Sequence, residues 1–209
     1  MDVKFIHALE SKLHDDLPGE SAHILMAPAG IEKYRNISPD YKLACVLALI
    51  FPKEKEWHLC LIERASEQIN DKHAGQISFP GGRMDENDDS FEHCALRETY
   101  EEIGVSPENI GILGSLSPIF VHVSNFLVHP YVGFTTEYPK FVKQHSEVKN
   151  IIEVPLMHFT KSRNKGLTDI QVRDIVIPQT PYYDIYGHKL WGATAMIISE
   201  LEHILNELD

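Results

Sequence analysis

The sequence has little positive charge and no long apolar run. Its 209 residues hold 19 Lys and Arg against 31 Asp and Glu, so the formal net charge is −12 at pH 7. A strongly negative surface repels nucleic-acid phosphates and anionic lipid headgroups, and no local basic patch offsets it, so we expect neither a nucleic-acid nor a membrane partner. The longest apolar run, Leu43–Phe51, stops at Pro52. It is far shorter than the roughly 20 residues of a membrane-spanning helix and predicts a buried strand.

Cysteine is also scarce, and we expect no targeting signal. Cys45, Cys60 and Cys94 form no CxxC pair, so we expect them to be buried structural side chains. Among the 12 histidines no HxxxH or HExxH pair supports a zinc site. The N-terminal residues are charged and amphipathic, with no apolar stretch leading to a small-residue cleavage site, and we therefore expect a cytoplasmic protein.

The residue pattern predicts more strands than helices. Apolar spacing and capping residues favour helices at 2–14, 88–103 and 192–208, with an irregular connection over 18–39. Strands are expected at 43–51, 57–62, 110–117, 126–135, 150–155, 170–177 and 182–185. Because the strands come in adjacent runs, the pattern favours an α/β (α+β) fold with a mixed β-sheet flanked by helices. We divide the chain into an N-terminal helix and connection, 1–40, and a main domain, 41–209.

The chemistry-bearing feature is a group of glutamates in the predicted helix 88–103. Glu98, Glu101 and Glu102 are spaced i, i+3 and i+4, so one helix face carries three carboxylates that repel one another. A solvated surface face is the plainest interpretation of such a triplet. However, Pro80-Gly81-Gly82 precedes the helix and lets the backbone approach a ligand closely. Together these features favour a hard divalent cation with oxygen ligands.

A calcium-binding loop is the competing metal motif, and it fails. Asp85, Asn87 and Asp89 have the 1, 3, 5 spacing of such a loop. The loop also requires Gly at its sixth position and Glu at its twelfth, where this chain has Ser90 and Leu96.

The segment resembles the signature box of the Nudix hydrolases. Arg97–Val105 matches the second half of that box, with Thr99 in place of an apolar residue. In the first half a one-residue insertion is needed to align Gly82, and Asp88 or Asp89 replaces the first glutamate. The resemblance implies the Nudix fold, a mixed β-sheet sandwiched between α-helices, with the box at about 82–105. It also implies hydrolysis of a phosphoanhydride.

Segments outside the box resemble the coenzyme A pyrophosphatase subgroup of that superfamily. They are His73–Gly82, the strand end Leu61–Arg64, the element Glu147–Leu156 and the helix start Leu190–Ala195. One departure is that Ile69–Lys72 stands where the subgroup usually has an arginine.

The resemblance and the chemistry of the side chains together suggest roles for individual residues. Mg²⁺ or Mn²⁺ would be held by Glu98, Glu102, Glu101 and the carbonyl of Gly82, and the general base would be Glu98 or, as runner-up, Glu147. The expected substrate-binding residues are Arg64, Lys72, His73, Gln76 and Arg83. Arg97 would have a structural role, paired with Asp88 or Asp89.

Three functional hypotheses follow. The leading one is a metal-dependent hydrolase that cleaves coenzyme A or acyl-coenzyme A to 3′,5′-ADP and a 4′-phosphopantetheine product. The second applies the same chemistry to ADP-ribose or a dinucleotide. The third, of another class, is a Nudix-fold module that senses a nucleotide without turnover. The apolar face of the helix 192–208 fits either the core or a dimer surface, so a homodimer stays open.

Overall fold

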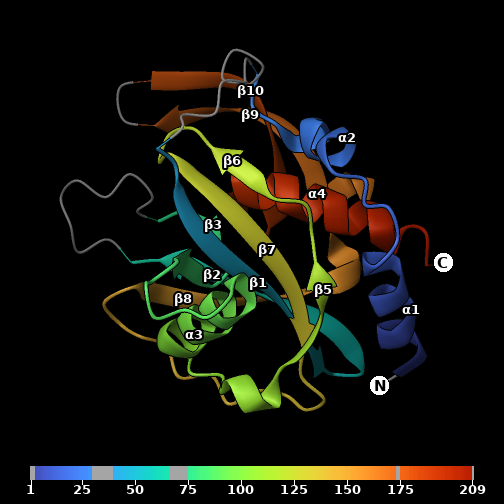
Figure 1. Cartoon of the computed structure of the whole chain (residues 1–209). Helices are drawn as coiled ribbons and strands as arrows, with labels where there is room; N and C mark the ends of the chain where they lie inside the picture. The colour runs from blue at the N-terminus through green and yellow to red at the C-terminus, as the bar shows by residue number, and fades with distance from the viewer. Residues whose placement is uncertain (1–2, 30–39, 66–74, 173–174, 209) are drawn as a thin grey trace.

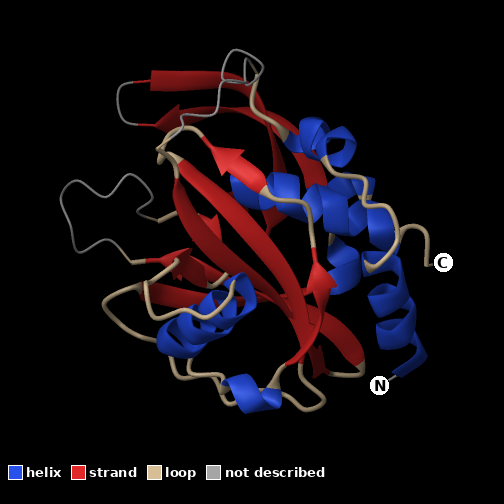
Figure 2. Ribbon diagram, viewed as in Figure 1, coloured by secondary structure: helices blue, strands red, loops and turns tan. Residues whose placement is uncertain are grey.

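A mixed β-sheet with helices on both faces forms the centre of the computed structural model, as expected (Figures 1 and 2). The structure describes residues 3–29, 40–65, 75–172 and 175–208. The helices are α1 (Val3–Leu13), α2 (Glu20–His23), α3 (Phe91–Ile103) and α4 (Ala193–Leu205), with 3-10 turns η1 (Ile24–Met26), η3 (Pro107–Asn109), η4 (Leu156–His158) and η5 (Ser162–Asn164). The strands are β1 (Lys42–Lys53), β2 (Glu56–Arg64), β3 (Ile77–Ser78), β4 (Gly81–Arg83), β5 (Gly111–Ser115), β6 (Ile119–Val121), β7 (Phe126–Phe134), β8 (Val148–Pro155), β9 (Lys165–Val172), β10 (Ile175–Ile185) and β11 (His188–Leu190).

Strand β1 organises the main sheet because it pairs with three neighbours. One edge runs parallel to β7 along nearly its whole length. The other edge is divided: the second half of β1 forms a hairpin with β2, and the first half of β1 pairs with the short β4, where Cys45 lies opposite Gly82. Since Leu47 N–H also donates to Pro80 O at 2.9 Å, the glycine segment is fixed at the middle of the sheet.

The two faces of the sheet bury separate apolar cores. Along β1, Cys45, Leu47 and Leu49 pack toward α3, whereas Ala48 and Ile50 pack toward α1 and α4. A strand that is covered on both faces has a continuous apolar sequence, and this explains why residues 43–51 are apolar throughout. Helix α4 lies in this chain's own core, with Ile198, Leu201 and the other residues of its apolar face buried.

The C-terminal strands differ from the sequence expectation. The single strand predicted at 170–177 is wrong, because β9 ends at Val172 and β10 begins at Ile175, and the two pair antiparallel with Ile170 opposite Ile177. Two apolar strand ends that lie close together in the chain resemble one strand in sequence. With β11 they form a second, three-stranded sheet. Part of the predicted irregular segment 18–39 is helical, as α2 and η1.

Candidate active site around the box helix

Helix α3 begins and ends where its local sequence requires. Ser90 is the N-cap, and its Oγ accepts a hydrogen bond from His93 N–H at 3.0 Å. Gly104 ends the helix in the left-handed region at φ 72°, a conformation that glycine adopts without steric cost. Thr99, the departure from the family pattern, is buried, and its hydroxyl donates to Ala95 O at 2.7 Å. The hydroxyl is thus satisfied within the helix.

Two of the three glutamates face the glycine segment. Glu102 is buried, and its Oε2 accepts a hydrogen bond from the backbone N–H of Gly81 at 2.8 Å. Glu98 lies against Gly82 so closely that a Cβ at that position would stand 2.3 Å from Glu98 Oε2. Only glycine therefore allows this approach. Gly81 has φ 150°, and a Cβ there would meet the backbone O of Cys45 at 2.3 Å, so both glycines are required by the geometry.

Arg97 ties the loop before α3 to the helix. Its Nε and Nη2 donate to the two carboxylate oxygens of Asp88 at 2.9 and 2.8 Å. Its Nη1 donates to Glu98 Oε1 at 2.8 Å and to Glu101 Oε2 at 3.2 Å. Such a bidentate pair is the geometry that a guanidinium favours with a carboxylate. Asp88 is the buried partner, whereas Asp89 is exposed.

The electrostatics of the site differ from one carboxyl to the next. Burial raises the pKa of Glu102 to about 7, although the Gly81 N–H and Arg64 act in the opposite direction. Burial also raises the pKa of Glu98, against the pull of Arg97. By contrast, the hydrogen bonds from Arg97 lower the pKa of Asp88 to about 2. Strongly shifted carboxyls at one place are typical of functional sites.

Arg64 and Glu147 reach the same region from other elements. Arg64, at the end of β2, places Nη1 3.6 Å from Glu102 Oε1. Gln76 is bonded to Arg64 through the backbone, since Arg64 N–H donates to its carbonyl at 3.0 Å. Glu147 is exposed, and its negative charge contributes to the raised pKa of both Glu98 and Glu102. The loop that carries it is held to α3 by the bond from Gln144 N–H to Glu102 O at 2.8 Å.

The remaining predicted residues lie at the edge of this group or outside the described part. The side chain of Glu101 is 55% exposed, so it faces solvent more than Glu98 and Glu102 do. Arg83 is exposed at the end of β4, and its carbonyl accepts a hydrogen bond from Arg97. Lys72 and His73 lie outside the described residues. Sequence reasoning missed the hydrogen bond from the backbone N–H of Gly81 to Glu102. The glycine pair in Pro80-Gly81-Gly82 was the signal that could have indicated it.

The residues present fit a hard divalent cation. Glu98, Glu102 and the Gly82 carbonyl offer oxygen atoms of the kind that Mg²⁺ and Mn²⁺ prefer, and the Glu98 carboxylate lies close to Gly82. Within the described ranges, no set of three or more His, Cys, Asp or Glu side chains is already gathered for a metal ion. The candidate donor set consists of two carboxylates and one backbone oxygen.

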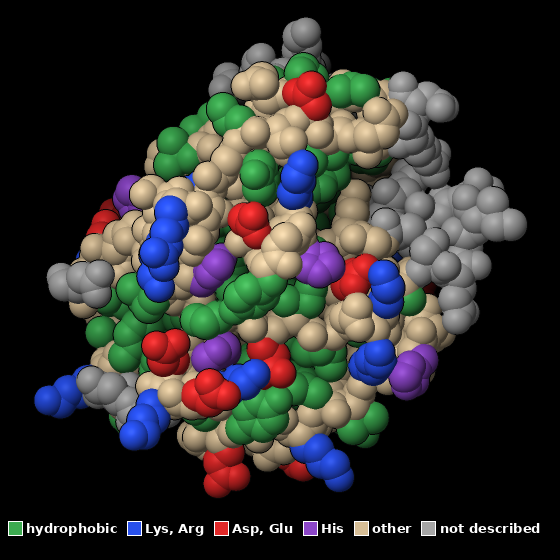
Figure 3. Space-filling model, turned by 180° about the vertical axis from the view of Figure 1, so that it is seen from behind, with side chains coloured by type: hydrophobic (Ala, Val, Ile, Leu, Met, Phe, Trp, Pro, Cys, Tyr) green, Lys and Arg blue, Asp and Glu red, His purple; other side chains and the backbone are tan. Residues whose placement is uncertain are grey.

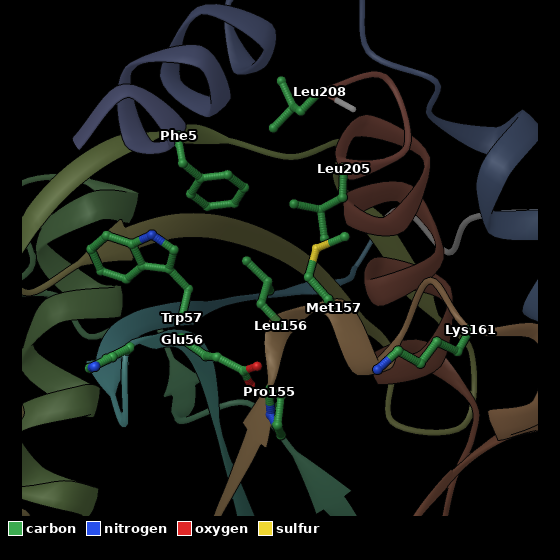
Figure 4. A pocket seen from close by; sticks show the side chains of 10 residues that line it. Phe5, Glu56, Trp57, Pro155, Leu156, Met157, Lys161, Leu205 and Leu208 are labelled. Atoms are coloured by element: carbon green, nitrogen blue, oxygen red, sulfur yellow. The ribbon is translucent and has the colours of Figure 1, made fainter. Parts of the chain in front are cut away.

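A cavity of about 340 Å³ lies elsewhere in the molecule (Figure 4). It is walled by α1, the β1–β2 turn, η4 and the end of α4, with Phe5, Trp57, Leu156 and Leu205 among its lining residues. These four side chains belong to the core on the α1 and α4 side of the sheet, whereas α3 packs on the other side. The cavity is therefore separate from the carboxylate group.

The surface seen in Figure 3 carries mixed charge. Lys and Arg side chains lie scattered among acidic, histidine and apolar ones on that face, rather than in one basic stripe. No helix in the described part of the chain is long and apolar enough to cross a bilayer.

Comparisons with known proteins point to one family. The NUDIX domain model matches residues 42–165. A protein of Pectobacterium atrosepticum described as an uncharacterized Nudix hydrolase NudL is 38% identical over 145 residues, which cover 68% of this chain and 72% of that protein. The human mitochondrial coenzyme A diphosphatase NUDT8 is 31% identical over 133 residues, covering 63% of this chain and 56% of that protein.

Two solved structures share the fold at low sequence identity. The Nudix hydrolase RenU from M. smegmatis has a TM-score of 0.54 at 16% identity, covering 81% of this chain and 88% of that one. The MutT protein of Methanosarcina mazei has a TM-score of 0.51 at 16% identity, covering 82% and 99%. With its box helix packed on a glycine strand of a mixed sheet, and with the domain match over most of the main sheet, the chain belongs to the Nudix pyrophosphohydrolase family.

Proposed function

We propose that this protein hydrolyses coenzyme A or an acyl-coenzyme A at its diphosphate, with Mg²⁺ or Mn²⁺, to give 3′,5′-ADP and a 4′-phosphopantetheine product. The observation that carries the proposal is the pair of carboxylates, Glu98 and Glu102, held against Gly81 and Gly82. Like charges at this spacing weaken a helix, so a role in binding a cation and phosphate accounts for them better than a role in stability.

The substrate class is supported by sequence. Segments outside the box resemble the coenzyme A pyrophosphatase subgroup, and the human relative carries that activity in its name. ADP-ribose and dinucleotides present the same diphosphate linkage, so the choice among these substrates rests on resemblance rather than on the carboxylates.

Hydrolysis requires that the negative charge of the diphosphate be neutralised, that a water molecule be oriented in line with the bond to be broken, and that a base accept the proton of that water. A divalent cation held by Glu98, Glu102 and the Gly82 carbonyl, with Glu101 at the edge, would neutralise the phosphate oxygens and make a water molecule more acidic. The Glu98 carboxylate is our choice for the acceptor of the water proton, with Glu147 as the alternative. The water oxygen forms the new bond to one phosphorus, and the bridging oxygen leaves with the other phosphate.

Positively charged side chains near the carboxylates would hold the substrate. Arg64 lies at the end of β2 and Arg83 at the end of β4. The polar Gln76 is hydrogen-bonded to Arg64 through the backbone. Lys72 and His73 complete the proposed set.

A panel of substrates tests the proposal. Purified protein is incubated with coenzyme A, acetyl-coenzyme A, ADP-ribose or NADH, each with Mg²⁺ or Mn²⁺, and the products are identified by mass. We expect 3′,5′-ADP and 4′-phosphopantetheine from coenzyme A. Turnover of ADP-ribose alone would transfer the assignment to that substrate. Binding without turnover of any compound would favour a nucleotide-sensing module.

A further inference from the structure

Arg64 and the candidate cation site share one carboxylate. Glu102 Oε2 accepts a hydrogen bond from the Gly81 N–H at 2.8 Å, so Oε1 is the carboxylate oxygen that this bond leaves for a cation. Arg64 Nη1 lies 3.6 Å from Oε1. A cation that binds Glu102 through Oε1 would therefore stand beside the guanidinium.

These two positive groups cannot both keep that position. A divalent cation and a guanidinium within a few ångströms of one oxygen repel each other strongly, because the site is partly shielded from water. The Glu102 side chain is only 2% exposed, so the carboxylate has little freedom to turn away. The side chain of Arg64 is 31% exposed and can move. Its backbone stays fixed, since its N–H bonds to Gln76 and its C=O to Gly75, in the segment just before β3.

We infer that Arg64 is a positioning residue that exchanges partners: it neutralises Glu102 until a divalent cation binds, and it then turns to the phosphates of the substrate. This inference rests on the proposed function for the identity of the substrate but not for the exchange itself. The exchange makes cation binding and phosphate binding cooperative, because the cation releases the guanidinium that the phosphate needs. Phosphate also binds less well without the cation, since Arg64 is then engaged.

A purely structural role for Arg64 predicts the opposite effect on cation affinity. If the arginine only holds Glu102 in place, its removal leaves the carboxylate misplaced and weakens cation binding. If it competes with the cation, its removal strengthens cation binding. The sign of the change therefore separates the two accounts.

The test is Mn²⁺ affinity at pH 8, measured by calorimetry and Mn²⁺ electron paramagnetic resonance in the absence of nucleotide. Arg64→Gln should bind Mn²⁺ about two- to tenfold more tightly than wild type, the range that a partly exposed ion pair can supply. Arg64→Lys keeps the positive charge and should stay closer to wild type. Lys149→Leu is the matched control, because Lys149 pairs with the neighbouring Glu63 at 2.6 Å and should leave Mn²⁺ affinity within about twofold, as expected for an ion pair outside the site.

A second measurement follows phosphate binding. With Mn²⁺ saturating, Arg64→Gln should bind ADP, used as a probe for a nucleoside diphosphate, at least about tenfold more weakly than wild type, a loss typical of removing a charged hydrogen bond. Unchanged or weakened Mn²⁺ affinity in Arg64→Gln would overturn the exchange. That result does not depend on turnover, so absence of coenzyme A hydrolysis would refute the proposed substrate and leave the exchange to be decided by the Mn²⁺ affinities.

Discussion

The carboxylate of Glu102 accepts a hydrogen bond from the backbone N–H of Gly81 at 2.8 Å, which joins the box helix to the glycine strand β4. Because β4 pairs with β1 in the middle of the sheet, this bond anchors the carboxylate to the main sheet. The neighbouring Glu98 is placed by its contact with Gly82. The site is thus built on regular elements, which hold catalytic groups more precisely than loops do.

Gly82→Ala should displace Glu98. The added methyl would stand 2.3 Å from Glu98 Oε2, and because that atom ends a flexible side chain, the carboxylate moves while the fold survives. We expect Mn²⁺ affinity to fall about 10- to 100-fold, the usual effect of disturbing the support of a metal ligand. Calorimetry with Mn²⁺ measures it.

A double-mutant cycle supplies the control for that prediction. In a Glu98→Ala background the atom that the methyl meets is gone, so Gly82→Ala should cause no further loss of Mn²⁺ affinity. An equal loss in both backgrounds would show that the glycine acts by another route.

Asp88 should stabilise the fold in a pH-dependent way. Its pKa is lowered to about 2 by Arg97, so the stabilisation is full above the unfolded-state pKa and disappears as pH falls from about 4 toward 2. Asp88→Asn should cost about 2 kcal/mol at pH 7, and the difference from wild type should shrink toward pH 2. Urea unfolding at several pH values measures both.

Asp89→Asn is the matched control for the Asp88 variant. Asp89 is adjacent but exposed, so the change should alter the free energy of unfolding by less than about 0.5 kcal/mol. Equal destabilisation by the two variants, or a cost of Asp88→Asn that does not vary with pH, would contradict the role assigned to the Arg97 pair.

Thr99→Val should be nearly neutral. The hydroxyl donates to Ala95 O within the same helix, a bond that adds little to helix stability. Valine has nearly the same shape as threonine and has no polar group to desolvate. We expect a change in unfolding free energy within about 1 kcal/mol and catalytic rates within about twofold of wild type. A large loss of activity with the fold intact would give the hydroxyl a role in the site that its hydrogen bond does not indicate.

Local features of the fold were predictable from sequence, and long-range ones were not. The bounds of α3 follow from Ser90 and Gly104, because caps act within one turn. The short strand β4 is Gly81–Arg83, which has no strand propensity, and its pairing is imposed by β1. The run 170–177 joined the ends of two strands because both are apolar.

The candidate site, like the fold, was predictable from sequence only in its local features. The i, i+3, i+4 spacing predicted that three glutamates share a helix face, but which of them is buried depends on how α3 packs on the sheet. The structure buries Glu102 and leaves Glu101 largely exposed. The approach of Arg64 to Glu102 joins β2 to α3, a contact for which a single sequence carries no periodic signal.

The most direct test of the account is the release of 3′,5′-ADP from coenzyme A by wild type, Glu102→Gln and Glu108→Gln, each with Mn²⁺ and with EDTA. Glu108, an exposed residue just after α3, controls for the loss of one negative charge. The account predicts rapid release by wild type and Glu108→Gln with Mn²⁺. It predicts at least about a 100-fold fall in Glu102→Gln and no release in EDTA. Release by folded Glu102→Gln at the wild-type rate would contradict it.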